Sequence, residues 1–188
     1  VQATLGELCT TIAEPVAASL ALAAGAACTH QQPKGDGTVD AGGLLAVGTA
    51  APDFSVVAHD GKTVTLSALR GKYVVLYFYP RDDTSGCTKE ACSFRDAWGE
   101  LQARGVVVLG VSTQDNEAHQ AFAAKHALPF QLLPDTDRAL TGAYNVPVTL
   151  TMAKRVTYLI GPDGKIAKVW PSVTPVGHAR DILSSLPP

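Results

Sequence analysis

The chain has 188 residues, of which 46% are hydrophobic and 17% charged, and its formal net charge is −2 with histidine neutral. That length is enough for one domain with a proper hydrophobic core. The near-neutral charge and the sequence pI of about 6.2 give no electrostatic reason to expect a nucleic-acid partner, which normally meets a basic face or stripe. We therefore expect a globular domain with no nucleic-acid partner.

The first 46 residues differ in composition from the rest. From Val16 to Cys28 the sequence is uncharged and ends in small residues, as the apolar part of an export signal does, although no basic residue precedes it. Cys28 resembles the lipid acceptor of a bacterial lipoprotein signal, and residues 29–43 are polar, like a flexible tether. We predict residues 1–46 to be a signal-like or flexible extension. This signal-like extension favours a protein of the bacterial cell envelope or periplasm, with a lipid tether on Cys28 as an option. The alternative is a cytoplasmic enzyme.

From Val47 onward the pattern becomes regular, and we predict one domain over residues 47–188. The runs Phe54–Val57 and Thr63–Leu66 are rich in strand-forming residues. Between them lies Asp60-Gly61-Lys62, which suits a turn. The segment therefore predicts a β-hairpin.

The next part of the domain reads as strand, helix, strand. Tyr73–Tyr79 is β-branched and aromatic almost throughout, typical of a strand buried on both faces, and Val106–Val111 is a second such run. Between them apolar residues recur at helical spacing, which predicts one amphipathic helix from about Ser85 to Arg104. Such a unit implies a parallel strand pair with a right-handed crossover.

The remaining elements complete an α/β fold. A helix is predicted from Asp115 or Asn116, both good N-caps, to about His126. Val156–Ile160 and Ile166–Trp170 flank a Gly-Pro-Asp-Gly turn and predict a second hairpin, and a final helix is expected over about 176–186. The sum is a single α/β domain with a mixed central sheet and helices on both faces.

The four cysteines, Cys9, Cys28, Cys87 and Cys92, are too few for a disulfide-stapled scaffold. Their spacing does not fit a zinc site either. Two close cysteines in a sizeable domain favour redox chemistry at Cys87 and Cys92, the alternative being two inert thiols. The sequence identifies no partner for Cys9.

Cys87 lies where a buried strand gives way to a helix. In an open α/β sheet, ligand sites form at the carboxyl ends of parallel strands. Cys87 is expected in the first helical turn, where free backbone N–H groups and the positive end of the helix dipole stabilise an anion. The thiolate is the nucleophilic form of cysteine, and its attack on a peroxide leaves a sulfenic acid. Cys87 is therefore the candidate nucleophile.

The spacing P-x-x-x-T-x-x-C, formed by Pro80, Thr84 and Cys87, resembles the active-site motif of the peroxiredoxins. The longer string resembles the bacterioferritin-comigratory, or PrxQ, branch, over roughly residues 47–187, with Ser85 where that branch usually has proline. The resemblance implies a thioredoxin-like fold and a thiol peroxidase, needing no cofactor, that reduces hydrogen peroxide and organic hydroperoxides. It also implies that Pro80 shields the thiolate and that Thr84 hydrogen-bonds the incoming peroxide.

The resemblance further implies an arginine on a later strand, and Arg155 stands at the matching place. Its guanidinium is always charged and can hold thiolate and peroxide oxygens together. Lys154 is a competing candidate, and either side chain could instead be a solvated charge at a strand end. Glu90 and Arg95 are candidates for orienting Arg155, with ordinary surface charges as the alternative.

Cys92 follows Cys87 by five residues. On one regular helix their Cα atoms would lie roughly 8 to 9 Å apart and face different directions, beyond the roughly 7 Å that a disulfide tolerates. We therefore hypothesise that the start of the helix unwinds when Cys92 reaches the sulfenic acid. The resemblance makes Cys92 the resolving cysteine, with the disulfide reduced by thioredoxin or a similar dithiol protein. The alternative is that Cys92 is a buried spectator.

Four histidines, His59, His119, His126 and His178, lie at no ligand spacing and are predicted to be surface residues. Two rival functions stay open. A peroxide sensor would use the same cysteine pair, and a thioredoxin-type oxidoreductase is disfavoured because no C-x-x-C is present. We expect a monomer or a weak dimer.

Overall fold

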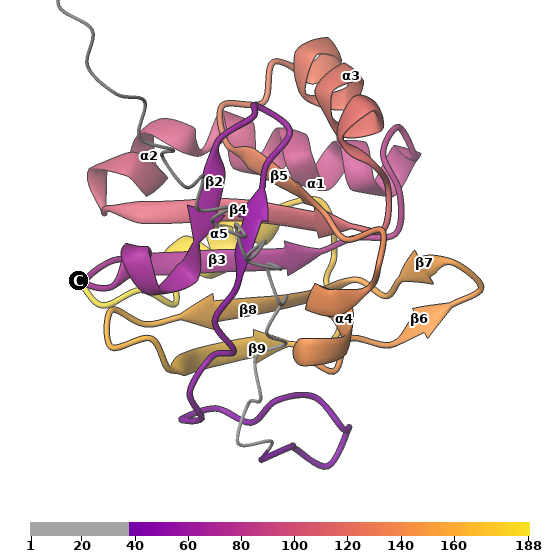
Figure 1. Cartoon of the computed structure of the whole chain (residues 1–188). Helices are drawn as coiled ribbons and strands as arrows, with labels where there is room; N and C mark the ends of the chain where they lie inside the picture. The colour runs from indigo at the N-terminus through magenta and orange to yellow at the C-terminus, as the bar shows by residue number, and fades with distance from the viewer. Residues whose placement is uncertain (1–37) are drawn as a thin grey trace, which may run out of the picture. The chain divides into compact units, whose positions relative to one another are not determined.

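The central feature of the computed structural model, which describes residues 38–188, is a five-stranded sheet in the order β5-β4-β3-β8-β9 (Figure 1). Its strands are β3 (Tyr73–Phe78), β4 (Val106–Ser112), β5 (Gln131–Pro134), β8 (Val156–Ile160) and β9 (Ile166–Trp170). β3, β4 and β5 are parallel, whereas β8 pairs antiparallel with both β3 and β9. The predicted mixed sheet and the predicted parallel pair are both confirmed.

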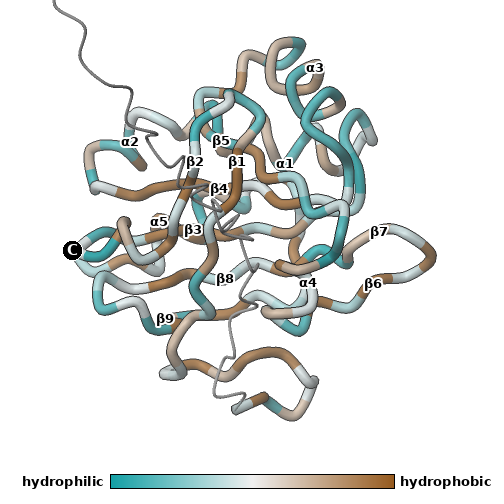
Figure 2. Tube along the Cα trace, in the orientation of Figure 1, coloured by the Kyte–Doolittle hydropathy of each residue, from teal (hydrophilic) through white to brown (hydrophobic). Residues whose placement is uncertain are grey.

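Alternate side chains of β3 enter two separate hydrophobic clusters, one on each face of the sheet, as the two-residue period of a strand requires. Val75 and Tyr77 join the cluster that includes residues of α1 (Ser85–Asp96), α2 (Trp98–Ala103), α3 (Asn116–His126) and α5 (His178–Leu183). In Figure 2 the strands of the sheet are largely hydrophobic, while α3 alternates between hydrophilic and hydrophobic residues.

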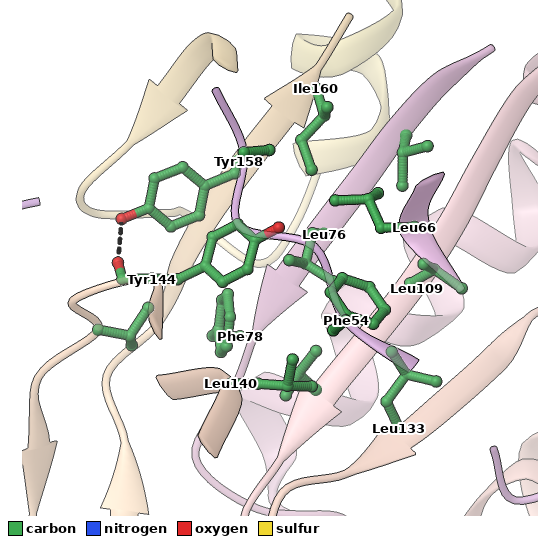
Figure 3. Packing of buried hydrophobic residues seen from close by; sticks show 14 of the residues in the cluster. Phe54, Leu66, Leu76, Phe78, Leu109, Leu133, Leu140, Tyr144, Tyr158 and Ile160 are labelled. Atoms are coloured by element: carbon green, nitrogen blue, oxygen red, sulfur yellow. Dashed lines mark hydrogen bonds between the residues drawn. The ribbon is translucent and has the colours of Figure 1, made fainter. Parts of the chain in front are cut away.

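The opposite face is covered by the hairpin of β1 (Ser55–Val57) and β2 (Thr63–Thr65), by the 3-10 helix η1 (Leu66–Leu69) and by the short helix α4 (Ala139–Ala143). Figure 3 shows Phe54, Phe78 and Tyr144 packed together in this layer. The buried phenol of Tyr158 donates to the carbonyl of Tyr144 at 2.7 Å, and that of Tyr144 donates to the carbonyl of Pro52 at 2.8 Å. These bonds link the segment before β1, through the end of α4, to β8 of the sheet, and neither hydroxyl is left unpaired.

Several predicted elements are confirmed in their details. Asp115 caps α3, its side chain accepting from the backbone N–H of Ala118 at 2.9 Å. The first hairpin pairs Val57 with Thr63, and the second is formed by β8 and β9 as expected.

The prediction of one continuous helix from Ser85 to Arg104 is wrong, because the helix breaks at Ala97. Ala97 has φ −92° and ψ 5°, outside the helical range. Asp96 and Gly99, both weak helix formers, flank the break, and Leu101 of α2 is nevertheless fully buried in the core. Three further elements were not predicted: β5, α4 and the small hairpin of β6 (Val148–Thr149) and β7 (Met152–Ala153).

The segment before Val47 contributes to the domain. Leu44 and Leu45, which lie on the extension side of the predicted boundary, are buried in the core, and Leu45 forms an isolated bridge with Val39. Over residues 38–188 no helix is long and apolar enough to cross a membrane. The predictions for Cys9, for the signal-like segment and for a lipid on Cys28 lie outside the described residues.

Candidate active site

Cys87 is the third residue of α1, which begins directly after the loop that follows β3. The residue before α1, Thr84, has extended backbone angles (φ −81°, ψ 146°), so the chain turns sharply into the helix. Cys87 is only 2% exposed and packs in the cluster that contains Tyr77 and Phe94. The predicted position of the sulfur, at a strand end and in the first helical turn, is confirmed.

A guanidinium group lies against this sulfur. Nη2 of Arg155 donates to Sγ of Cys87 at 3.2 Å, and Nη1 of Arg155 donates to Oε2 of Glu90. Arg155 reaches the site because it directly precedes β8, which is hydrogen-bonded to β3. Gly86 leaves space for the approach, since a Cβ there would lie 3.2 Å from Nη2. Arg155 therefore meets Cys87, whereas neighbouring Lys154 is exposed.

Glu90 is the buried partner of this arginine. It is fully buried, and its Oε1 atom has no hydrogen-bond partner. Burial raises the pKa of its carboxyl group to about 7, with Arg155 opposing the shift. Burial alone would lower the pKa of Arg155, but Glu90 and Cys87 outweigh it and raise that pKa above its ordinary value. The guanidinium thus stays charged while the charge of Glu90 depends on pH near neutrality.

Of the two residues proposed to orient Arg155, only Glu90 contacts it. Arg95 instead pairs with Asp96 at 2.8 Å and donates from Nη1 to the carbonyl of His126 at 2.9 Å. Glu90 and Cys87 are three residues apart and hence neighbours on one helix face, which is the pattern in the sequence that points to Glu90.

Thr84 and Pro80 lie in the loop between β3 and α1. The hydroxyl of Thr84 donates to the carbonyl of Arg81 at 3.0 Å, and the residue is exposed. Pro80 is half-buried and, with Arg81 and Arg138 among others, lines a cavity of about 310 Å³. In the described part of the chain no hydrogen bond joins Thr84 to Cys87.

Cys92 occupies a different surface of the same helix. Both cysteines are free thiols, but Cys92 is half-buried and lines a groove of about 930 Å³ between α1, α2 and α5. Lys89, Arg104 and Arg180 are among the side chains that line this groove. Because α1 is a continuous helix from Ser85 to Asp96, five residues rotate Cys92 well away from Cys87.

The prediction that the histidines lie on the surface is wrong for His119 and His178, which are both buried. Nδ1 of His119 lies 2.7 Å from Oδ2 of Asp82. Nε2 of His178 lies 2.9 Å from the hydroxyl of Thr157, and burial lowers the pKa of His178 to about 4. Each pairing joins residues far apart in the sequence, so no local pattern indicates it. Within residues 38–188 no group of three or more His, Cys, Asp or Glu side chains could hold a metal ion.

Comparison with known proteins identifies the family to which the chain belongs. The model of the AhpC/TSA family matches residues 47–169. The chain is 40% identical over 149 residues to peroxiredoxin Bcp of Bacillus subtilis, which covers 76% of this chain and 95% of the relative. It is 42% identical over 142 residues to the chloroplastic peroxiredoxin Q of Populus jackii, covering 74% and 67%.

The chain is a peroxiredoxin of the AhpC/TSA family. The crystal structure of the peroxidoxin BcpB from Mycobacterium tuberculosis superposes with a TM-score of 0.69 at 32% identity, covering 74% of this chain and 94% of that one. The predicted thioredoxin-like fold and the predicted membership of the Bcp/PrxQ branch are thereby confirmed. The peroxiredoxin is a thiol peroxidase, an oxidoreductase that reduces peroxides.

Proposed function

We propose that Cys87 is the peroxidatic cysteine of this peroxiredoxin and Cys92 its resolving cysteine. The observation that carries the first assignment is the contact of 3.2 Å between the guanidinium of Arg155 and the sulfur, at a helix N-terminus. Both features stabilise negative charge on that sulfur. Cys92 lines the open groove, and the guanidinium that interacts with it is that of Arg95 and not that of Arg155.

The first step consumes one peroxide. The Cys87 thiolate attacks the nearer oxygen of ROOH, an S–O bond forms and the O–O bond breaks. Cys87 becomes a sulfenic acid, and the alkoxide or hydroxide leaves as ROH or water after taking up a proton. Arg155 stabilises the charge as it moves from sulfur to oxygen. Thr84 hydrogen-bonds the peroxide, and Pro80 keeps water from the thiolate. The substrates are hydrogen peroxide and organic hydroperoxides.

The second step joins the two cysteines. The thiol of Cys92 attacks the sulfenic sulfur, water leaves, and a disulfide between Cys87 and Cys92 forms. Because both residues lie on α1, that helix opens locally for the bond to form. A dithiol reductant of the thioredoxin type then exchanges with the disulfide and restores both thiols. Since both cysteines belong to one chain, the cycle needs no second subunit, in agreement with a monomer or weak dimer.

The test is peroxide consumption driven by a thioredoxin system, on the wild type and on Cys87→Ser and Cys92→Ser. We expect Cys87→Ser to consume peroxide no faster than buffer. Cys92→Ser should oxidise once and then stop, because its sulfenic acid is not resolved. Sustained turnover by Cys87→Ser would refute the first assignment, and sustained turnover by Cys92→Ser the second.

Mass spectrometry adds a direct readout. Trypsin cleaves after Lys89, between the two cysteines, so the reduced protein gives two separate peptides. After one equivalent of peroxide we expect these peptides to be linked by a disulfide. An overoxidised Cys87 peptide with Cys92 free would contradict the proposed resolution step.

A further inference from the structure

Two consecutive aspartates of the loop between β3 and α1 are each paired with a histidine of α3. Asp82 pairs with His119, and Asp83 pairs with His126. The two histidines are seven residues apart, two helical turns, and so lie on the same face of α3. This face therefore contacts the loop that carries Pro80 and Thr84.

The two pairs differ sharply in their surroundings. Asp82 is 7% exposed and His119 is 0% exposed. The side chain of Asp83 is 47% exposed, and it is shared between His126 at 3.1 Å and Lys125 at 2.9 Å. Exposed pairs of this kind contribute at most about 1 kcal/mol. A buried pair behaves differently, because loss of one partner leaves the other unpaired away from water.

The side-chain polar atoms of the buried pair each have a partner. Oδ2 of Asp82 lies 2.7 Å from Nδ1 of His119, and Oδ1 accepts from the hydroxyl of Tyr79 at 2.7 Å. The backbone N–H of Asp82 donates to Oε1 of Gln114 at 2.5 Å. Because an ionised carboxylate only accepts, Nδ1 of His119 is the donor, which leaves Nε2 facing the hydroxyl of Ser112 at 3.4 Å.

We propose that His119, acting through Asp82, is a positioning residue for the peroxide-binding loop of this enzyme. Asp82 lies between Pro80 and Thr84, so its three bonds to the end of β3, to the segment after β4 and to α3 fix the backbone on which both residues sit. Arg155, by contrast, contacts Cys87 and Glu90 independently of this network. The inference rests on the proposed function of that loop.

This arrangement predicts that two reactions of Cys87 separate. Reaction with hydrogen peroxide needs Thr84 and Pro80 in place, whereas alkylation by iodoacetamide needs the Cys87 thiolate but no hydrogen bond from Thr84. Loss of His119 should therefore slow the peroxide reaction by about tenfold to 100-fold, the effect of a displacement on the order of 1 Å. The alkylation rate should change by less than threefold. A role confined to stability would leave the ratio of the two rates unchanged.

The experiment measures both rates at Cys87 by quench-flow, reading the tryptic peptide that ends at Lys89 by mass spectrometry. His119→Leu removes the donor to Asp82. His119→Asn places an amide N–H near the position of Nδ1 and should recover most of the peroxide rate. The matched control is His126→Leu, on the same face of α3 but in the exposed pair, and its two rates should stay within about twofold of the wild type.

Three outcomes would overturn the proposal: equal slowing of both reactions in His119→Leu, an effect of His126→Leu as large as that of His119→Leu, or no recovery in His119→Asn. If His119→Leu does not fold, Tyr79→Phe decides the question. It keeps the ring and removes one bond to Asp82, and an unchanged ratio of the two rates would then refute the proposal. Failure of the proposed function is distinct, since wild-type Cys87 would itself react slowly with peroxide.

Discussion

The two halves of α1 are held in the domain in different ways. In the first part of α1, from Ser85 to Ala91, the residues Cys87, Glu90 and Ala91 are each no more than 2% exposed. Cys87 and Ala91 pack in the aromatic cluster under the helix, and Arg155 binds both Cys87 and Glu90. The position of the first sulfur is thus fixed by packing and by charge together.

The second half, from Cys92 to Asp96, has one buried anchor, Phe94, which is 0% exposed and packs against Tyr77 and Phe130. Cys92 and Ser93 are half-buried along the groove beside α5, and the helix ends at Ala97 rather than continuing into α2. Two of its side chains bond to the rest of the fold. The hydroxyl of Ser93 accepts from the N–H of Ala179 at 3.3 Å, and Arg95 donates to the carbonyl of His126.

The difference matches what each sulfur has to do under the proposed mechanism. The thiolate that meets the peroxide gains from a fixed surrounding, because preorganised charge needs no rearrangement during the reaction. Cys92, by contrast, lies on the side of α1 that lines the open groove, whereas Phe94 anchors the buried side. Less buried parts of a fold open at a lower free energy than its core. Three changes test this contrast.

The largest expected effect is at the first half of α1, which contains Cys87 and Glu90 and which we call the fixed half. Arg155→Lys keeps a positive charge but removes the planar fork that contacts both Cys87 and Glu90. We expect the second-order rate of Cys87 oxidation by hydrogen peroxide to fall by about 10²- to 10³-fold, the range for loss of one preorganised donor. Stopped-flow measurement with hydrogen peroxide gives this rate directly.

Lys154→Gln is the matched control, because Lys154 is exposed and adjacent to Arg155. Its rate should equal that of the wild type. If Lys154→Gln were the slower variant, the assignment of the cation would be reversed. Thermal unfolding of both variants shows whether the loss in Arg155→Lys arises from the site or from the fold.

The fixed half was also the more predictable one. A buried strand followed by a helix-forming segment is a local pattern, and it places Cys87 correctly. The P-x-x-x-T-x-x-C spacing then directed attention to Arg155, whose contact with Cys87 spans 68 residues. Without that resemblance the choice between Arg155 and Lys154 would have stayed open, because adjacent charges at the start of a strand look alike in the sequence.

What could not be predicted depends on distant partners. The burial of His119 follows from its bond to Asp82, 37 residues away, and no periodicity encodes such a pairing. β5 has only four residues and ends in Pro134, so it resembles a loop until β4 pairs with it. The break at Ala97 is set by competition between weak local propensity and the burial of Leu101, which only the packed structure decides.

The second change concerns the buried charge of the fixed half. The pKa of Glu90 is raised from 4.5 to about 7 in the folded protein, so between these values the folded state keeps a proton that the unfolded state has released. The free energy of unfolding should therefore decrease as pH rises through this window. The contribution of Glu90 is fully present below pH 4.5 and is lost above pH 7. Each unit of pKa difference corresponds to about 1.4 kcal/mol, which gives an expected loss of about 1–3 kcal/mol.

Urea denaturation of the reduced protein at pH 5 and at pH 7.5 measures this loss. In Glu90→Gln the pH dependence should be smaller by that amount, because the amide does not titrate. Glu100→Gln, which alters an exposed glutamate of α2, should keep the full dependence of the wild type. An identical pH dependence in the wild type and in Glu90→Gln would show that Glu90 is ionised across the range.

The smallest effect is expected at the second half of α1, from Cys92 to Asp96, and it is an increase in a rate rather than a loss. Arg95→Gln removes the bond from the last turn of α1 to the carbonyl of His126, which lowers the free energy of opening that turn by about 0.5–1 kcal/mol. Disulfide formation after oxidation should become about two- to fivefold faster, while the peroxide reaction at Cys87 stays unchanged. Lys89→Gln serves as the control, since Lys89 is exposed on the same helix. A slower disulfide step in Arg95→Gln would contradict this expectation, because it would show that Arg95 acts mainly through its interaction with Cys92 and not by holding the end of the helix closed.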